Sequence, residues 1–171
     1  MTVVWRVKQD GGQSLADGTE ELVAKHPEHE ALIRAFYARW PEMLRGKLPR
    51  GMAIFNGLRA AGVPLYALTN WASETWPIAL ARYPFLQGFR RIVVSGDERL
   101  VKPDPSIFRL THDRIALDLP GILEGEVAFI DDNLPNVEAA ARFGWRAIHH
   151  ADDHAERTTA KLREFGVPLP S

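Results

Sequence analysis

Hydrophobic and polar positions follow two different patterns along the chain. Between residues 13 and 48 apolar residues recur at helical spacing, which predicts helices throughout this segment. Ser14 and Asp17 resemble an N-terminal capping pair at the start of the first helix. A second helix with a wide apolar stripe is expected from about Pro27 to Leu44. The stretch RGKLPRG then ends the helical pattern with two glycines and a proline.

After Gly51, short apolar runs alternate with helical segments. Four buried strands are predicted by VPLYALT (63–69), RIVVSG (91–96), VAFID (127–131) and RAIHH (146–150). Helices are expected from Met52 to near Gly62, over 73–83, after Asp104 and Pro105, over Pro135–Phe143 with Gly144 as its end, and from about Asp153 to Phe165. Strands that alternate with helices indicate βαβ units and a parallel sheet. We therefore predict an α/β fold.

Length, charge and cysteine content narrow the class of protein. A chain of 171 residues suits one domain with a small appended segment, which we divide into residues 1–48 and a core of residues 49–171. The formal net charge of −1 argues against a broad electrostatic attraction to nucleic acid or anionic membranes. The chain has no cysteine and no apolar run of membrane-spanning length. We therefore expect a cytoplasmic protein that binds neither nucleic acid nor membranes.

Polar side chains follow the predicted strands at their carboxyl ends. Thr69 and Asn70 end the first strand, Lys102 follows the second in VKPDP, and Asp131 and Asp132 end the third. Because ligands bind beyond the carboxyl ends of parallel strands, we expect these residues at one rim of the sheet. A hydroxyl can donate to phosphate oxygens, a lysine neutralises phosphate charge, and paired carboxylates suit Mg²⁺. The rim is therefore chemically suited to a phosphorylated ligand.

Taken in order, these motifs resemble those of the haloacid dehalogenase-like (HAD) hydrolase superfamily, over roughly Gly51 to His150. The strand ending in a hydroxyl residue matches LYALTN at Thr69, and the lysine motif matches VKPDPSIF at Lys102. The acidic pair matches FIDDNLPNVEAA at Asp131 and Asp132. The preceding helical segment resembles the small cap that many members insert after their first strand. The resemblance implies a three-layer, Rossmann-like parallel sheet with a small, partial helical cap at the N-terminus.

The same resemblance implies a Mg²⁺-dependent phosphatase that acts on a small phosphorylated metabolite through an aspartyl-phosphate. Its implied site comprises Thr69 and Lys102 as catalytic residues, Asn70 and Trp71 as further substrate contacts, and Asp131 and Asp132 as metal ligands. A 2-haloacid dehalogenase and an inactive relative with a binding role are the alternatives. The acidic pair favours the phosphatase, because dehalogenation needs no metal. The identity of the substrate and the formation of a homodimer stay open.

One motif of the family has no match in this chain. The family's nucleophilic aspartate follows an apolar N-terminal strand, whereas Asp10 follows TVVWRVKQ, in which Arg6 and Lys8 suit a central strand poorly. A surface turn before a helix is the better interpretation of Asp10. In the family's strand order 5-4-1-2-3, loss of the first strand leaves a gap in the sheet. We expect TVVWRV, a partner chain or a longer natural chain to fill it, so catalytic activity is left undecided.

Overall fold

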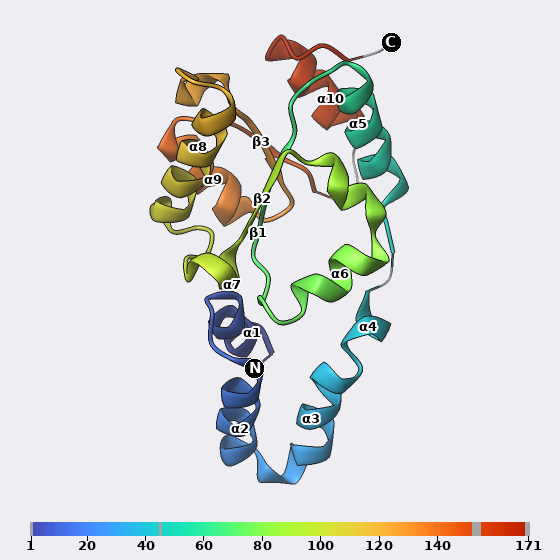
Figure 1. Cartoon of the computed structure of the whole chain (residues 1–171), viewed down its shortest axis with the longest axis vertical. Coiled ribbons are helices and arrows are strands. Elements are labelled where there is room, and N and C mark those ends of the chain that lie inside the picture. The colour runs from blue at the N-terminus through green and yellow to red at the C-terminus, as the bar shows by residue number, and fades with distance from the viewer. Residues whose placement is uncertain (1, 45, 152–154, 170–171) are drawn as a thin grey trace. The chain divides into compact units, whose positions relative to one another are not determined.

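The computed structural model describes residues 2–44, 46–151 and 155–169 and alternates helices with short strands (Figure 1). The α-helices of the described residues are α1 Thr2–Asp10, α2 Leu15–Lys25, α3 Glu30–Ala38, α4 Trp40–Met43, α5 Pro49–Ala60, α6 Trp76–Arg82, α7 Ser95–Glu98, α8 Pro105–Asp118, α9 Leu134–Phe143 and α10 Ala155–Glu164. The strands are β1 Tyr66–Thr69, β2 Arg91–Val94, β3 Ala128–Asp131 and β4 Arg146–His149, and 3₁₀ turns cover Pro27–His29, Pro84–Gly88 and Glu124–Glu126.

The strands of the described residues form two separate sheets of two strands each. β1 pairs with β2, and β3 pairs with β4. The second pair is parallel, with Ala128 opposite Arg146 and Asp131 opposite His149. Strands alternate with helices along the chain, so the predicted α/β class with parallel strands is confirmed. The sequence predicted that the family's first core strand is missing and that its loss leaves a gap in the sheet. The division of the four strands into two separate sheets agrees with this prediction.

The chain divides into two compact units, each of which is discontinuous in sequence. The first unit comprises residues 1–46, 68–87 and 93–101, and the second comprises 47–67, 88–92 and 102–171. In the first unit α1 and α3 both pack against α2, and α1 also contacts α7. In the second unit α9 packs on both β3 and β4, α8 packs against α9, and α10 contacts α5 and β4. The described residues include no helix long and apolar enough to cross a membrane.

The segment TVVWRV is a helix and not the strand that was one expected way of closing the sheet. Trp5 and Gln9 lie one helical turn apart in α1, and both are buried. Arg6 and Lys8 fall on the exposed face of the same helix. A strand would have placed alternate residues on one face, whereas this burial follows the helical period. The prediction that TVVWRV fills the gap in the sheet is therefore wrong.

Other predicted boundaries shift for local reasons. The helix expected over Pro27–Leu44 breaks at Arg39, because Pro41 is tolerated in the first turn of α4 but would disrupt the interior of a longer helix. The strand expected to continue to Gly96 ends at Val94, and Ser95 begins α7. The expected start of the last helix at Asp153 lies outside the described residues, and its described part runs to Glu164.

Side chains at the helix starts act much as the sequence predicts. The Ser14 hydroxyl accepts a hydrogen bond from the backbone N–H of Asp17 at 3.0 Å, which satisfies a free donor in the first turn of α2. Asp104 caps α8 in the same way by accepting from the N–H of Ser106 at 2.7 Å. This hydrogen bond lowers the pKa of Asp104. Gly144 ends α9 with a φ of 110°, a left-handed conformation that glycine adopts without strain.

The core of the second unit has an aromatic half and an aliphatic half. Phe108 of α8 is fully buried, and its ring contacts three other aromatic rings, those of Phe129, Phe143 and Trp145. The aliphatic half joins buried residues of α5, β4 and α10, namely Ile54, Leu58, Ile148 and Leu162. These contacts bury the apolar stripes of the helices against the β3–β4 pair. The carboxyl end of β3 is thereby anchored on a packed core.

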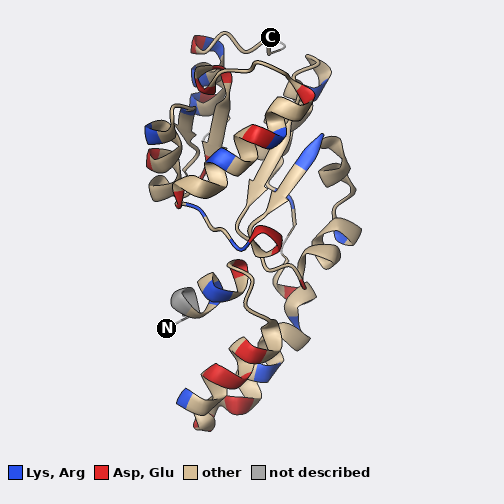
Figure 2. Cartoon of the chain, turned by 60° about the vertical axis from the view of Figure 1, so that its left-hand side comes forward, with Lys and Arg blue, Asp and Glu red and all other residues tan. Residues whose placement is uncertain are grey.

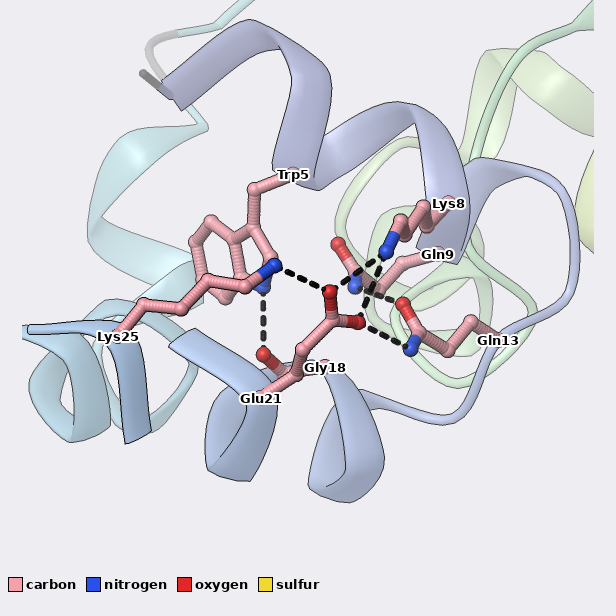
Figure 3. A network of polar contacts seen from close by, with 7 residues as sticks. All are labelled: Trp5, Lys8, Gln9, Gln13, Gly18, Glu21 and Lys25. Atoms are coloured by element: carbon pink, nitrogen blue, oxygen red, sulfur yellow. Dashed lines mark hydrogen bonds and ion pairs between the residues drawn. The ribbon is translucent and has the colours of Figure 1, made fainter. Parts of the chain in front are cut away.

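A polar network holds α1 against α2 in the first unit (Figure 3). The indole N–H of Trp5 donates to the carbonyl of Gly18 at 2.8 Å, and the Gln9 amide donates to Gln13 Oε1 at 2.8 Å. Glu21 accepts from Lys8 at 2.6 Å and from Lys25 at 2.7 Å. Figure 2 shows where acidic and basic residues lie along the chain. Glu21 of α2 is the centre of this network. Its hydrogen bonds to Lys25, Lys8 and Gln13 lower the pKa of Glu21 to about 2.

Gly18 is expected to resist substitution by any larger residue. A Cβ at this position would collide with the Gln9 side-chain amide and lie 3.3 Å from the Trp5 Nε1. Gly18→Ala should lower the free energy of unfolding by about 1–3 kcal/mol, because the fully buried Gln9 has little room to move. The matched control is Gly51→Ala in α5, where the new Cβ meets only Leu48 at 3.7 Å and the higher helix propensity of alanine should add up to about 1 kcal/mol. Urea unfolding followed by circular dichroism measures both, and equal effects would contradict the predicted collision.

The Glu21 network predicts a specific loss of stability in acid. Because the folded-state pKa of Glu21 is about 2 and its ordinary value is 4.5, its contribution is complete above the ordinary value and is lost as the pH falls through the folded-state value. Glu21→Gln should therefore flatten the fall of the urea midpoint between about pH 5 and about pH 2. Glu28→Gln removes one charge at a side chain that is 60% exposed and serves as the control. Identical pH profiles for the two variants would contradict the prediction.

Candidate functional site

Asp131 stands at the carboxyl end of β3, and its carboxylate accepts hydrogen bonds from three donors. Its Oδ1 accepts from the backbone N–H of Asn133 at 2.8 Å and from the side-chain amide of Asn136 at 3.1 Å. Its Oδ2 accepts from the Nζ of Lys102 at 2.6 Å. The residue is buried, so these donors replace the water that an exposed carboxylate would bind. The carboxylate is therefore held in one orientation, with Oδ2 toward Lys102.

Lys102 reaches this carboxylate from the loop that precedes α8. The side chains of Lys102 and Asp131 are 8% and 6% exposed, so the ion pair is almost completely removed from water. The Nζ of Lys102 also lies over the ring of Phe129, 5.6 Å from its centroid. Charges buried in this way are costly unless they are paired and hydrogen-bonded, and here Asp131 is both. The second unit thus brings together two residues that the sequence places 29 positions apart.

Asp132 differs from its neighbour in environment. It is exposed, and it lies in the turn between β3 and α9. Its backbone carbonyl lies 3.0 Å from the Nε2 of His149 at the end of β4, so Nε2 must carry the proton of that hydrogen bond. Of the predicted acidic pair, one carboxylate is thus buried and paired and the other faces water. Only the Asp131 carboxylate is therefore removed from water, and Lys102 balances its charge. Water hydrates the Asp132 carboxylate, which weakens the repulsion between the two neighbouring acids.

The donor set at this strand end is compatible with Mg²⁺. Mg²⁺ is commonly held by one or two carboxylates, several waters and the phosphate of a substrate. Oδ1 of Asp131 already accepts two hydrogen bonds, whereas Oδ2 accepts one from Lys102 and keeps a lone pair for a further contact. Asp132 adds an exposed carboxylate. Among the described residues no group of three or more histidine, aspartate or glutamate side chains gathers as a larger metal cage.

The remaining predicted site residues belong to the first unit. Thr69 is the last residue of β1 and is partly buried, and Asn70 and Trp71 follow it directly. The backbone N–H of Trp71 donates to the Ser95 hydroxyl at 2.9 Å, and this hydroxyl donates to the backbone carbonyl of Asp10 at 2.6 Å. The fully buried Ser95 therefore ties the end of β1 to the end of α1. Lys102, Asp131 and Asp132 belong to the second unit.

Asp10 is not simply a surface residue. It is the last residue of α1 and is followed by the turn at Gly11 and Gly12, as the sequence predicts for a turn before a helix. Its side chain is partly buried, however, and burial raises the pKa of Asp10 although nearby Arg6 opposes this. Burial and the charge of Asp10 raise the pKa of Tyr37 to about 12. Asp10 thus ends a helix and not an apolar strand of the kind that precedes the nucleophile in the family's motif.

Sequence reasoning missed two residues that fix the geometry of these strand ends. Asn136 is buried in the first turn of α9 and donates to Asp131, and Ser95 bridges Trp71 and Asp10. The signal for Asn136 was present as an asparagine within the first turn of a helix that follows an acidic strand end. The signal for Ser95 was a small hydroxyl residue directly after an apolar strand. Both are common features of turns, so neither stands out without coordinates.

The amino-acid sequence matches a known family over most of its length. Residues 3–144 match the family described as haloacid dehalogenase-like hydrolase. The chain is also 30% identical over 105 residues to drimenol cyclase drtB from Aspergillus calidoustus, a match that covers 61% of this chain and 19% of the cyclase. The chain therefore spans only about a fifth of the curated relative that it matches.

Solved structures resemble the fold at low sequence identity. A mutant HAD family enzyme from Bacteroides thetaiotaomicron, in complex with magnesium and inorganic phosphate, has a TM-score of 0.62 and 19% identity, over 82% of this chain and 72% of that chain. The crystal structure of a dehalogenase has a TM-score of 0.64 and 17% identity, over 92% of this chain and 73% of that chain. At these identities the structures show a shared fold, and the sequence match shows the family. The chain belongs to the haloacid dehalogenase-like hydrolase family.

Proposed function

We propose that this chain carries out Mg²⁺-dependent hydrolysis of a small phosphorylated metabolite. The observation that carries the proposal is the buried Lys102–Asp131 ion pair at the end of β3, with the exposed carboxylate of Asp132 beside it in sequence. This end combines a fixed cation for an anionic substrate with carboxylate oxygens for a hard metal ion. The HAD family enzyme bound to magnesium and inorganic phosphate supports this choice of metal and substrate class.

The proposed roles follow from the chemistry of each side chain. Lys102 would donate to an oxygen of the transferring phosphoryl group while Asp131 holds its ammonium in place. The Thr69 hydroxyl and the polar groups of Asn70 and Trp71 would bind further substrate oxygens. Asp131 and Asp132 would hold Mg²⁺, which when bound offsets the negative charge of the phosphoryl group. Asn136 acts through Asp131 as a positioning residue.

The proposed reaction has two steps that the family resemblance supplies. An aspartate carboxylate attacks phosphorus, the P–O ester bond breaks, and the leaving alkoxide takes a proton from water to depart as the alcohol. Water then attacks the aspartyl-phosphate, which releases inorganic phosphate and restores the carboxylate. Asp10 is the carboxylate of this chain considered for the first step, although it ends a helix and not an apolar strand. Asp10→Asn therefore belongs in every assay of the reaction.

Hydrolysis of p-nitrophenyl phosphate by the 171-residue chain tests the proposal. We expect hydrolysis with Mg²⁺, its loss on chelation, and a fall in kcat of about 10²–10³ for Asp132→Asn, because that exposed carboxylate contributes charge without supporting the fold. Asp113→Asn in α8 is the control, since it removes an exposed carboxylate of the same unit away from the strand ends.

Two further experiments, with the Asp10→Asn variant and with a longer chain, identify the nucleophile. Loss of hydrolysis in Asp10→Asn with unchanged folding would assign the attack to Asp10. Hydrolysis that appears only when the chain is extended by upstream coding sequence would assign it to a residue outside these 171 positions. Failure of both forms to hydrolyse the ester with Mg²⁺, or full activity of Asp132→Asn, would overturn the proposal.

The same ion pair predicts a strong effect on stability, separate from activity. Lys102→Met should lower the free energy of unfolding by about 3–5 kcal/mol, because it leaves the buried Asp131 carboxylate without its partner. The double variant Lys102→Met with Asp131→Asn should lose less than the sum of the two single variants, because no unpaired charge remains. Urea unfolding of the four proteins gives the coupling energy. Additive losses would show that the pair is not coupled in solution.

A further inference from the structure

Two tryptophans of the first unit bury hydrogen-bond donors for which the described part of the chain supplies no acceptor. The Nε1 atoms of Trp40 and Trp71 are buried, and neither finds an acceptor among the described residues. Their rings contact each other, with centroids 6.0 Å apart and planes at 86°. Buried indole N–H groups normally find an acceptor, because leaving one unpaired costs the hydration that it had in water. Two such donors on rings in contact therefore form an unusual feature.

Two other tryptophans of the chain have an acceptor for the indole N–H group. Trp5 donates to the carbonyl of Gly18 at 2.8 Å, and Trp145 lies 3.5 Å from the Nδ1 of His112. The contact between Trp40 and Trp71 cannot replace two such bonds, since in a perpendicular pair only one ring presents its edge to the face of the other. Contacts of an indole edge with a ring face are also weaker than a hydrogen bond to oxygen, so both N–H groups keep unsatisfied donor capacity.

The surroundings of the two rings are firmly held. The backbone of Trp71 donates to Ser95 Oγ at 2.9 Å, and its carbonyl accepts from the N–H of Gly96 at 3.1 Å. A Cβ at Gly96 would lie 2.8 Å from that carbonyl, so only glycine permits this close approach. The backbone carbonyl of Pro41, next to Trp40, accepts from Arg82 at 2.9 Å. Donors held in this way need little ordering when a ligand binds.

Chemistry around the pair favours a flat, apolar molecule that carries an oxyanion. Trp71 also contacts the ring of Trp76 at 5.6 Å, and Trp40 contacts those of Phe36 and Tyr37 at 5.7 and 5.9 Å. These rings offer apolar faces, the indoles offer donors, and the Arg82 guanidinium near Trp40 adds positive charge. A polyol phosphate would match the donors but not the apolar faces. A quaternary ammonium would match the faces but not the donors.

We infer that Trp40 and Trp71 form a recognition element for phosphate esters of flat, apolar alcohols, with their indole N–H groups donating to ester or phosphate oxygens. This inference rests on the proposed function in so far as it treats Trp71 as a substrate-binding residue. It adds Trp40 as a second donor and restricts the substrate class to aryl-type phosphates. Binding needs no turnover, so the inference and the phosphatase proposal can fail separately.

Nuclear magnetic resonance of the indole N–H groups tests the inference on the full chain. The chain has five tryptophans, so five indole signals are expected, and Trp40→Phe and Trp71→Phe assign two of them. Phenyl phosphate should shift the Trp40 and Trp71 signals downfield and leave those of Trp5 and Trp145 in place, because the latter already have acceptors. Glycerol 3-phosphate, inorganic phosphate and benzyltrimethylammonium should produce no comparable shift.

Variants separate recognition from packing. Trp40→Phe and Trp71→Phe keep an aromatic ring and remove the N–H, so each should raise the dissociation constant of phenyl phosphate about tenfold. Trp145→Phe is the matched control, because it removes an indole N–H that already lies against His112 outside this aromatic cluster, and it should bind phenyl phosphate like the parent chain. Unmoved Trp40 and Trp71 signals, or equal shifts with any of the other three probes, would overturn the inference. Shifts without hydrolysis would support it and count against the phosphatase alone.

Discussion

The second unit depends on one buried pair of opposite charges. Lys102 and Asp131 are both almost fully removed from water, and burying either charge without the other would be costly. The N–H of Asn133 and the amide of Asn136 take the other carboxylate oxygen, so the pair is anchored on the start of α9. This arrangement ties the loop before α8 to the end of β3. The functional end of the unit is therefore part of its structural framework.

Residue patterns predicted the framework of the fold well. All four strands lie within the apolar runs identified from the sequence, because only such runs can be buried on a sheet. The proximity of Lys102 and Asp131 also followed from the rule that the carboxyl ends of parallel strands and the loops after them share one rim. These successes depend on periodicity and chain order, which sequence displays directly.

The failures concern features that depend on tertiary contacts. TVVWRV has the β-branched and aromatic residues of a strand, yet it is helical, with Trp5 donating to Gly18 of α2 and Gln9 of the same helix donating to Gln13 in the following turn. Periodicity over so few residues cannot separate the two outcomes. The sequence also could not predict that Asp131 is buried while Asp132 is exposed. This difference depends on the tertiary contacts of Asp131 with Lys102 and Asn136.

The contact between Gly18 and Gln9 has a consequence for how this sequence can change. The two positions lie on different helices, and the absence of a side chain at one makes room for the amide at the other. They therefore cannot vary independently: a larger residue at position 18 requires a shorter one at position 9. Substitutions in this helical pair should be inherited together, and a change at either position alone narrows what evolution can tolerate at the other.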